Sequence, residues 1–206
     1  MPLPKVVIFD LGKVLVDFDY SIAARRIASR SKISAEAIKQ FIDHSPLLFR
    51  YETGLMTKSQ FYQEICGATG FCGEIDEFCR FFSDIFVPDP LMVSMQAELR
   101  RAGLRTYIFS NTNELAIEHV RREFPFFSNF DGYILSFEHG AMKPDAKLYE
   151  VVERTSGARG QEILYLDDRP ENISAGEARG WQVILQESSE RSLRAIQGLG
   201  LLKKMS

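Results

Sequence analysis

Three aspartates in this 206-residue chain stand directly after apolar runs. Asp10 follows the run at residues 6–9, and Asp167 and Asp168 follow the run at 164–166. Such runs are typical of strands buried on both faces of a parallel sheet, and ligands bind at the carboxyl ends of these strands. A carboxylate attacks phosphorus when a cation screens the phosphate, and magnesium prefers oxygen ligands. The pattern therefore predicts a magnesium site beside a nucleophilic carboxylate.

Gly12 adds a backbone oxygen to this set. A glycine lets the chain turn closely around whatever Asp10 holds. The Gly12 carbonyl, Asp10 and one or both of Asp167 and Asp168 would form the protein part of an all-oxygen shell of the kind magnesium prefers. Paired aspartates also occur in ordinary turns and helix caps. The apolar strand that precedes this pair favours the metal site.

Ser110 and Lys143 complete the set of candidate site residues. Ser110 ends another apolar run, so its hydroxyl and the amides of Asn111 and Thr112 can bind phosphate oxygens at a helix N-terminus. Ser110 can equally serve as a helix N-cap. Lys143 stands before Pro144, where it can neutralise the charge of the carboxylates and the phosphate, although a lone lysine is often simply solvated.

Four stretches of the chain resemble, in order, the motifs of the haloacid dehalogenase superfamily of phosphatases and related hydrolases. They are residues 9–15 (FDLGKVL), 107–113 (YIFSNTN), 142–144 (MKP) and 164–172 (LYLDDRPEN). The resemblance covers nearly the whole chain. It implies an α/β core with a helical cap and hydrolysis through a covalent aspartyl intermediate.

The same resemblance implies roles for individual residues. It makes Asp10 the nucleophile, and it assigns phosphate binding to Ser110 with support from Asn111. Lys143 would neutralise charge and contact the phosphate. Magnesium would be held by Asp10, the Gly12 carbonyl and Asp168 directly, with Asp167 behind Asp168.

The chain departs from this pattern at Gly12, where most phosphatases of the group have a second aspartate. That aspartate protonates the leaving alcohol and then activates water, and its loss costs ~10²- to 10⁴-fold on difficult substrates. An Asp-Leu-Gly opening resembles a bacterial subgroup that includes sugar-1-phosphate phosphatases, whose leaving groups are relatively acidic. The candidates to replace the missing acid are Asp17, His44, Glu52 and His139, each of which can also be merely exposed.

Composition and charge restrict the possible functions. Hydrophobic residues make up 45% of the chain and charged residues 26%, which is typical of a globular protein of one domain with a modest insertion. The net charge of −3 gives no basic field, so nucleic-acid binding is not expected. No targeting leader and no apolar run of roughly 20 residues is visible, which predicts a cytoplasmic protein without a membrane span. We expect Cys66, Cys72 and Cys79 to be reduced thiols.

Hydrophobic periodicity predicts two structural regions. Strands and helices alternate after residue 88, which predicts a three-layer, Rossmann-like α/β core with a parallel sheet. Helical patterns fill the interval after the first strand. We expect a core at 1–16 and 88–206 and an all-helical cap at 17–87. The expected strands are 6–9, 105–109, 132–135, 163–166 and 183–185, and the expected cap helices are 21–30, 34–43, 58–67 and 74–86.

These observations favour a magnesium-dependent phosphatase that acts on a small phosphorylated metabolite, with sugar phosphates among the candidates, through an aspartyl-phosphate intermediate. One alternative is a metal-independent 2-haloacid dehalogenase using the same nucleophile. Another is a non-catalytic, phosphate-binding regulatory protein that lost turnover with the second aspartate. Cap residues 45–54 would select the substrate. The sequence carries no signal for the oligomeric state.

Overall fold

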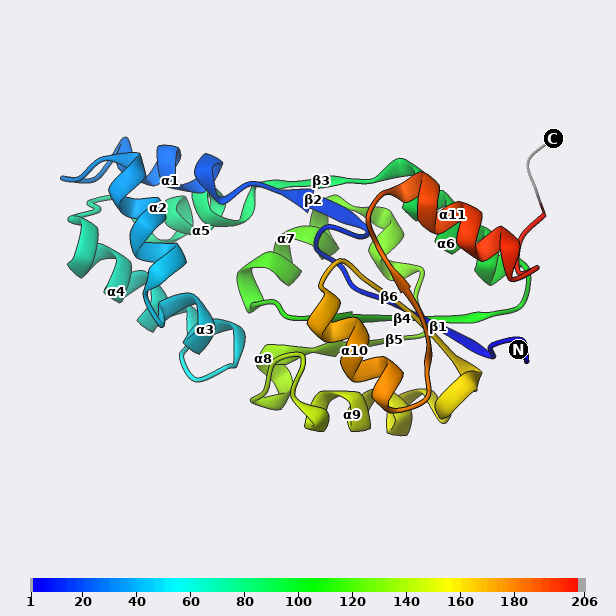
Figure 1. The fold of residues 1–206 in the computed structure, drawn as a ribbon. Helices are drawn as coiled ribbons and strands as arrows, with labels where there is room; N and C mark the ends of the chain where they lie inside the picture. The colour runs from blue at the N-terminus through cyan, green and yellow to red at the C-terminus, as the bar shows by residue number, and fades with distance from the viewer. Residues whose placement is uncertain (1, 204–206) are drawn as a thin grey trace.

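A computed structural model describes residues 2–203 and contains a five-stranded parallel sheet with the strand order β5-β4-β1-β6-β7 (Figure 1). This arrangement confirms the predicted α/β class. The strands are β1 (Val6–Phe9), β4 (Arg105–Ser110), β5 (Gly132–Leu135), β6 (Ile163–Asp167) and β7 (Gln182–Leu185).

Helices cover both faces of the sheet and make it the middle of three layers (Figure 1). Alternate residues of β1 point to opposite faces, so Val7 belongs to one buried cluster and Val6 to the other. Burial on both faces explains the continuous apolar run. One cluster includes residues of α6 (Pro90–Arg101), α7 (Glu114–Glu123) and α11 (Ser189–Gly198), and the other includes residues of α9 (Ala146–Ser156) and α10 (Pro170–Ala178).

The strand order places the site at the carboxyl edge of the sheet. The chain runs from β1 to β4 and β5 on one side, and then crosses to β6 and β7 on the other. Asp10 directly follows the central strand, and Ser110 and Asp167 are the last residues of its two neighbours. Ligands bind at such a reversal of strand order, so the topology alone brings these three residues together.

Five helices form a separate body beside the sheet, on the left of Figure 1. They share an apolar cluster in which Phe61 stacks on Tyr51 with ring centroids 4.5 Å apart and contacts Phe78 and Phe82. The helical body therefore has an aromatic core of its own. The helices are α1 (Tyr20–Ala28), α2 (Ala35–His44), α3 (Leu47–Glu52), α4 (Lys58–Thr69) and α5 (Ile75–Ser83).

An antiparallel ribbon joins this body to the sheet. Its strands are β2 (Val16–Phe18) and β3 (Phe86–Pro88). The sequence analysis missed the ribbon, because three-residue strands are too short to show a period. The ribbon straddles both expected boundaries, and we retain the core at 1–16 and 88–206 and the cap at 17–87 as a proposal.

Several helix boundaries differ from those expected. The helix expected at 74–86 ends at Ser83, and the one expected to end at residue 67 continues to Thr69. It ends there because Gly70 takes a left-handed conformation with φ of 68° and caps it. The short helices α3 and α8 (Ser136–His139) were not expected, since neither is long enough to show helical periodicity.

The remaining expectations concern cysteines and membranes. Cys66, Cys72 and Cys79 are free thiols in the structure. Among residues 2–203, every helix is too short or too polar to cross a lipid bilayer.

Candidate active site

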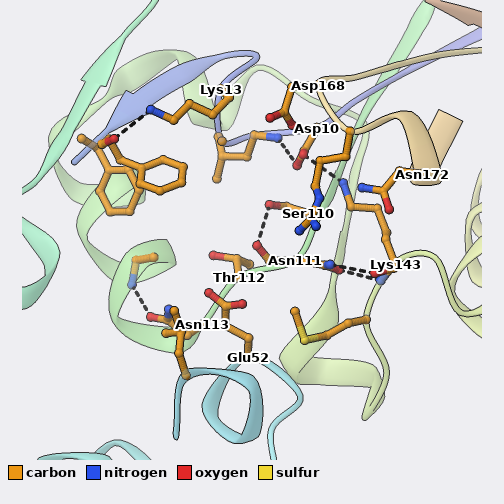
Figure 2. Close-up of a pocket in the computed structure, with 18 of the residues that line it drawn as sticks. Asp10, Lys13, Glu52, Ser110, Asn111, Thr112, Asn113, Lys143, Asp168 and Asn172 are labelled. Atoms are coloured by element: carbon orange, nitrogen blue, oxygen red, sulfur yellow. Dashed lines mark hydrogen bonds and ion pairs between the residues drawn. The ribbon is translucent and has the colours of Figure 1, made fainter. Parts of the chain in front are cut away.

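A pocket of about 430 Å³ opens where the carboxyl edge of the sheet faces the helical body (Figure 2). The sequence-predicted residues that line it are Asp10, Gly12, Ser110, Asn111, Lys143 and Asp168. Asp167 is completely buried just behind this wall. The sequence stretches that suggested chemistry thus meet in one place.

Lys143 is the cationic centre of the pocket floor. Its ammonium nitrogen lies 3.1 Å from Asp10 Oδ2 and 2.6 Å from Asp167 Oδ2, and it donates to the Phe109 carbonyl at 2.8 Å. Burial acts to lower the pKa of Lys143, but the two carboxylates outweigh it and the pKa is raised. The side chain is 1% exposed, so the expectation of a solvated lysine does not apply.

Asp167 is held by donors on every side. Its Oδ2 accepts from Lys143 and from the Tyr165 hydroxyl at 2.5 Å, and its Oδ1 accepts from the Arg169 amide and Asn172 Nδ2, both at 2.9 Å. Burial favours the neutral form, but Lys143 and the other donors hold the pKa of Asp167 below its usual value. Its lone pairs are therefore already committed to the protein.

Asp168 is placed differently from its neighbour. It lines the pocket, is half-buried, and takes part in none of the ion pairs formed among residues 2–203. Burial, followed by the charge of Asp167, raises the pKa of Asp168 above its usual value. Oxygen atoms of Asp10, Asp167 and Asp168 lie within 4.8 Å of one another. This donor set fits magnesium, with Asp10 and Asp168 facing the pocket and Asp167 behind them.

Asp10 is 8% exposed, and Leu11 donates its amide to Asp10 Oδ1 at 2.6 Å. Burial raises the pKa of Asp10 to about 7, with Asp167 adding to the rise and Lys143 opposing it. A divalent cation against this carboxylate would lower its pKa again and keep it ionised. The electrostatics of the floor are thus suited to a bound cation.

Asn111 fastens the loop that carries Lys143. Its Oδ1 accepts from the Lys143 amide at 2.7 Å, and its Nδ2 donates to the Lys143 carbonyl at 3.0 Å. Ser110 lies beside it, 2% exposed, with its hydroxyl facing the pocket (Figure 2). The suggestion that Ser110 caps a helix is wrong, because Asn113 caps α7 through the Ala116 amide.

Gly12 lies against the ring of Phe18. A Cβ atom built at Gly12 would be 2.8 Å from Phe18 Cε1, closer than non-bonded carbon atoms approach. Phe18 belongs to β2, and the ammonium group of Lys13 lies 4.7 Å from its ring centroid. The space where a side chain at position 12 would begin is therefore filled by an aromatic ring.

Of the four residues considered as a replacement acid, Glu52 lines the pocket and the other three do not. Asp17 is exposed and pairs with Lys13, and His44 is also exposed. His139 ends α8, outside the pocket lining. Glu52 ends α3 and directs its carboxyl group into the pocket beside Thr112 and Asn113 (Figure 2).

The structure also adds residues for which the sequence analysis gave no role. Asn172 and Tyr165 anchor Asp167, and Ser136 joins Thr112 to Glu52. Asn172 and Tyr165 lie within the 164–172 stretch, so position in that motif is the signal that could have found them. Ser136 carries no such signal, because only the packing of α8 against the end of α3 reveals it.

Comparison with known proteins identifies the family. Residues 4–180 match the model of the haloacid dehalogenase-like hydrolases, and the chain belongs to that family. The fold and the motif order predicted from the sequence agree with this assignment.

Two relatives are phosphatases. A sesquiterpene phosphatase of Aspergillus oryzae is 27% identical over 177 residues, covering 85% of this chain and 86% of that protein. A D-ribitol-5-phosphate phosphatase of Bacteroides thetaiotaomicron is 23% identical over 194 residues, covering 89% of this chain and 92% of that protein. Both matches span nearly the full length of this chain.

A solved structure shares the fold. An enzyme of the haloacid dehalogenase family from Bacteroides thetaiotaomicron, crystallised with magnesium and inorganic phosphate, superposes with a TM-score of 0.77 at 20% identity. The match covers 88% of this chain and 93% of that chain.

Proposed function

We propose that this hydrolase is a magnesium-dependent phosphatase that cleaves a small phosphorylated metabolite through an aspartyl-phosphate on Asp10. The observation that carries the proposal is the grouping of Asp10, Lys143 and Asp168 at one pocket floor, with the lysine 3.1 Å from the Asp10 carboxylate. One carboxylate, one buried cation and a second carboxylate free for a metal are what phosphoryl transfer to an aspartate requires.

Each residue has a distinct role in this proposal. Asp10 Oδ attacks phosphorus, and the Ser110 hydroxyl and the Lys143 ammonium group hold phosphate oxygens. Asn111 keeps the Lys143 loop in place, and Asp167 keeps the lysine charged and aligned. Asp10, Asp168 and the Gly12 carbonyl would hold a magnesium ion, which would screen the phosphate charge when bound.

The pocket walls and the relatives support a small organic phosphate as the substrate. The side facing the helical body is lined by Phe18, Tyr20, Leu48 and Phe86, with Glu52 as its acidic residue. The relatives named above are, by name, a sesquiterpene phosphatase and a D-ribitol-5-phosphate phosphatase. We extend to this chain the class that they share, a phosphate monoester, with sugar and polyol phosphates among the candidates.

The dehalogenase alternative uses the same nucleophile without a metal. Asp168 weakens it, because a third carboxylate within 4.8 Å of Asp10 and Asp167 only repels them unless a cation is bound. For a non-catalytic phosphate-binding protein we find no specific observation in its favour.

The test is an assay of the purified chain on 4-nitrophenyl phosphate and a panel of sugar and polyol phosphates, with magnesium and with a chelator. We expect phosphate release that the chelator abolishes. Asp10→Asn should lower the rate by about 10³-fold or more while the protein stays folded, since an amide retains the shape but cannot attack phosphorus.

Contrary outcomes are distinct. Halide release from a 2-haloacid in the presence of chelator would support the dehalogenase instead. Phosphate binding without turnover of any substrate would support the regulatory protein. Substantial magnesium-dependent hydrolysis by folded Asp10→Asn protein would contradict the aspartyl-phosphate.

A further inference from the structure

The pocket lacks an acid at the position next to the nucleophile. Gly12 has no side chain, and Phe18 occupies the space where one would begin. The remaining acidic side chains in the pocket lining are Asp10, Asp168 and Glu52. In the proposed function Asp10 is the nucleophile and Asp168 binds the metal, so Glu52 is the pocket acid that remains without a role.

Glu52 is fixed onto the core although it belongs to the helical body. Its backbone carbonyl accepts a hydrogen bond from Ser136 Oγ at 2.6 Å, and Ser136 Oγ in turn accepts one from the Thr112 amide at 2.9 Å. Gly54 adopts a φ of +69°, and an added Cβ would lie 2.2 Å from the Phe137 carbonyl oxygen. The turn after Glu52 is therefore pressed against α8, which holds the carboxyl group over the site.

The surroundings of Glu52 favour a proton near neutral pH. Burial raises the pKa of Glu52 to about 7. The Asn113 side chain and the charge of Arg169 oppose this rise, and the charge of Asp10 adds to it. Tyr20 also lines the pocket, and burial, followed by the charge of Glu52, raises the pKa of Tyr20 and keeps it neutral. Within residues 2–203 the buried Asn113 Nδ2 makes no hydrogen bond of ordinary length, and it lies beside this carboxyl group (Figure 2).

We propose that Glu52 is the general acid and base of this enzyme, a role that rests on the proposed phosphatase function. As Asp10 Oδ bonds to phosphorus and the bond from phosphorus to the leaving oxygen breaks, the Glu52 carboxyl group gives its proton to that oxygen. Asn113 Nδ2 can then donate to the carboxylate that results. In the second step Glu52 takes a proton from water, the water oxygen bonds to phosphorus, and the Asp10 carboxylate leaves.

The decisive variant is Glu52→Gln, compared with the native protein on 4-nitrophenyl phosphate and on glycerol 3-phosphate. The alkoxide leaving group of glycerol 3-phosphate must be protonated, whereas nitrophenolate can leave almost without a proton. The single-turnover rate of Glu52→Gln on the alkyl ester should therefore fall ~10²- to 10⁴-fold, and its rate on the aryl ester should fall less than ~10-fold. The aryl ester should also give a burst of nitrophenol equal to the enzyme concentration, because the aspartyl-phosphate then forms faster than water removes it.

The matched control is Glu64→Gln. Glu64 is another glutamate of the helical body, but it is exposed, pairs with Arg50 at 2.9 Å and lies outside the pocket lining. It should match the native protein on both esters. Equal losses on both esters for Glu52→Gln, with no burst, would overturn the acid-base role. Absence of magnesium-dependent hydrolysis by the native protein would instead overturn the proposed function.

A measurement on the native protein keeps the test independent of how Glu52→Gln folds. Glu52 is protonated below a pH of about 7, so the rate of aspartyl-phosphate formation from the alkyl ester should fall as the pH rises above that value. The corresponding rate for the aryl ester should lack this alkaline decline. Identical pH profiles for the two esters above neutrality would contradict the role.

Discussion

The two walls of the pocket are built by opposite means. The core wall is a set of buried charges in which Lys143 bridges Asp10 and Asp167 at 3.1 and 2.6 Å. The wall next to the helical body is mostly aromatic, with Phe18 packed against Tyr20 and Phe86 at centroid distances of 5.4 and 5.9 Å. The difference indicates a division of work. In the proposed mechanism the core would supply preorganised electrostatics, and the ribbon and the helical body would supply shape and a single acid.

The two walls also differ in how they tolerate change. A buried ion pair is costly to break, since removal of one partner leaves a charge uncompensated. The aromatic side chains carry no charge, and their contacts with substrate should govern selection rather than chemistry. Substitutions of the buried ion-paired residues in the core wall should therefore affect both folding and turnover, and substitutions of the aromatic residues in the other wall should mainly alter substrate preference.

The largest effect is expected from Asp167→Asn. An amide in place of this carboxylate removes one of the two charges around Lys143 and sets an NH₂ group against donors, so the free energy of unfolding should fall by about 3–5 kcal/mol. Turnover should be lost and added magnesium should not restore it. Denaturant unfolding and a magnesium titration measure the two quantities.

Asp168→Asn is the matched comparison, because among residues 2–203 this carboxylate forms no ion pair, whereas Asp167 pairs with Lys143. Its stability should stay within about 1 kcal/mol of the native value. Its activity should fall steeply at low magnesium and recover in part at high magnesium. Equal destabilisation by the two substitutions would break the distinction between the buried and the pocket-facing aspartate.

A smaller effect is expected where the two walls are joined. Gly54→Ala places a Cβ 2.2 Å from the Phe137 carbonyl at a φ of +69°, whereas Gly157 has a φ of +67° and nothing within 4 Å. Gly157→Ala should lower the free energy of unfolding by about 1 kcal/mol, because only the left-handed conformation is unfavourable there. Gly54→Ala should lower it by about 1–3 kcal/mol more, because of the contact with Phe137. Thermal unfolding measures the difference. Equal costs would show that the contact with α8 is loose.

The core wall was largely predictable from sequence. Asp10, Ser110 and Asp167 each end a strand whose apolar run is visible, and parallel strands present their carboxyl ends at one edge. Lys143 was found by its place before Pro144 within a family motif. The roles of these residues stay predictions, but their meeting in one pocket follows from topology.

The other wall was not predictable to the same degree. The ribbon that brings Phe18 against Gly12 consists of three-residue strands, and its partner Phe86 was expected at a helix end. Glu52 was one of four candidates with nothing in the sequence to separate them, because its placement depends on Ser136 and on the backbone contact of Gly54. Contacts between segments distant in sequence leave no periodic trace.

The smallest effect is expected from Gly12→Asp in the native background. The sequence alone suggests that an aspartate at this position would supply the missing proton and narrow the rate gap between aryl and alkyl phosphates. Because the new Cβ would lie 2.8 Å from Phe18 Cε1, the ring must move before a carboxyl group can point at the leaving oxygen. In the proposed mechanism Glu52 already donates this proton. We expect the single substitution to change the ratio of aryl to alkyl rates by less than about 3-fold.

Removal of the ring should release this block. In a Phe18→Leu background, Gly12→Asp should lower the ratio of aryl to alkyl single-turnover rates by about 10-fold relative to Phe18→Leu alone, since an aspartate can then adopt a rotamer beside the leaving group. Folding and magnesium affinity are checked in all three variants. If Gly12→Asp changes the ratio of aryl to alkyl rates by the full 10-fold with Phe18 in place, the Phe18 ring moves aside easily. If Gly12→Asp has no effect in either background, position 12 is too far from the leaving oxygen. Proton transfer would then be left to Glu52 on the other wall of the pocket.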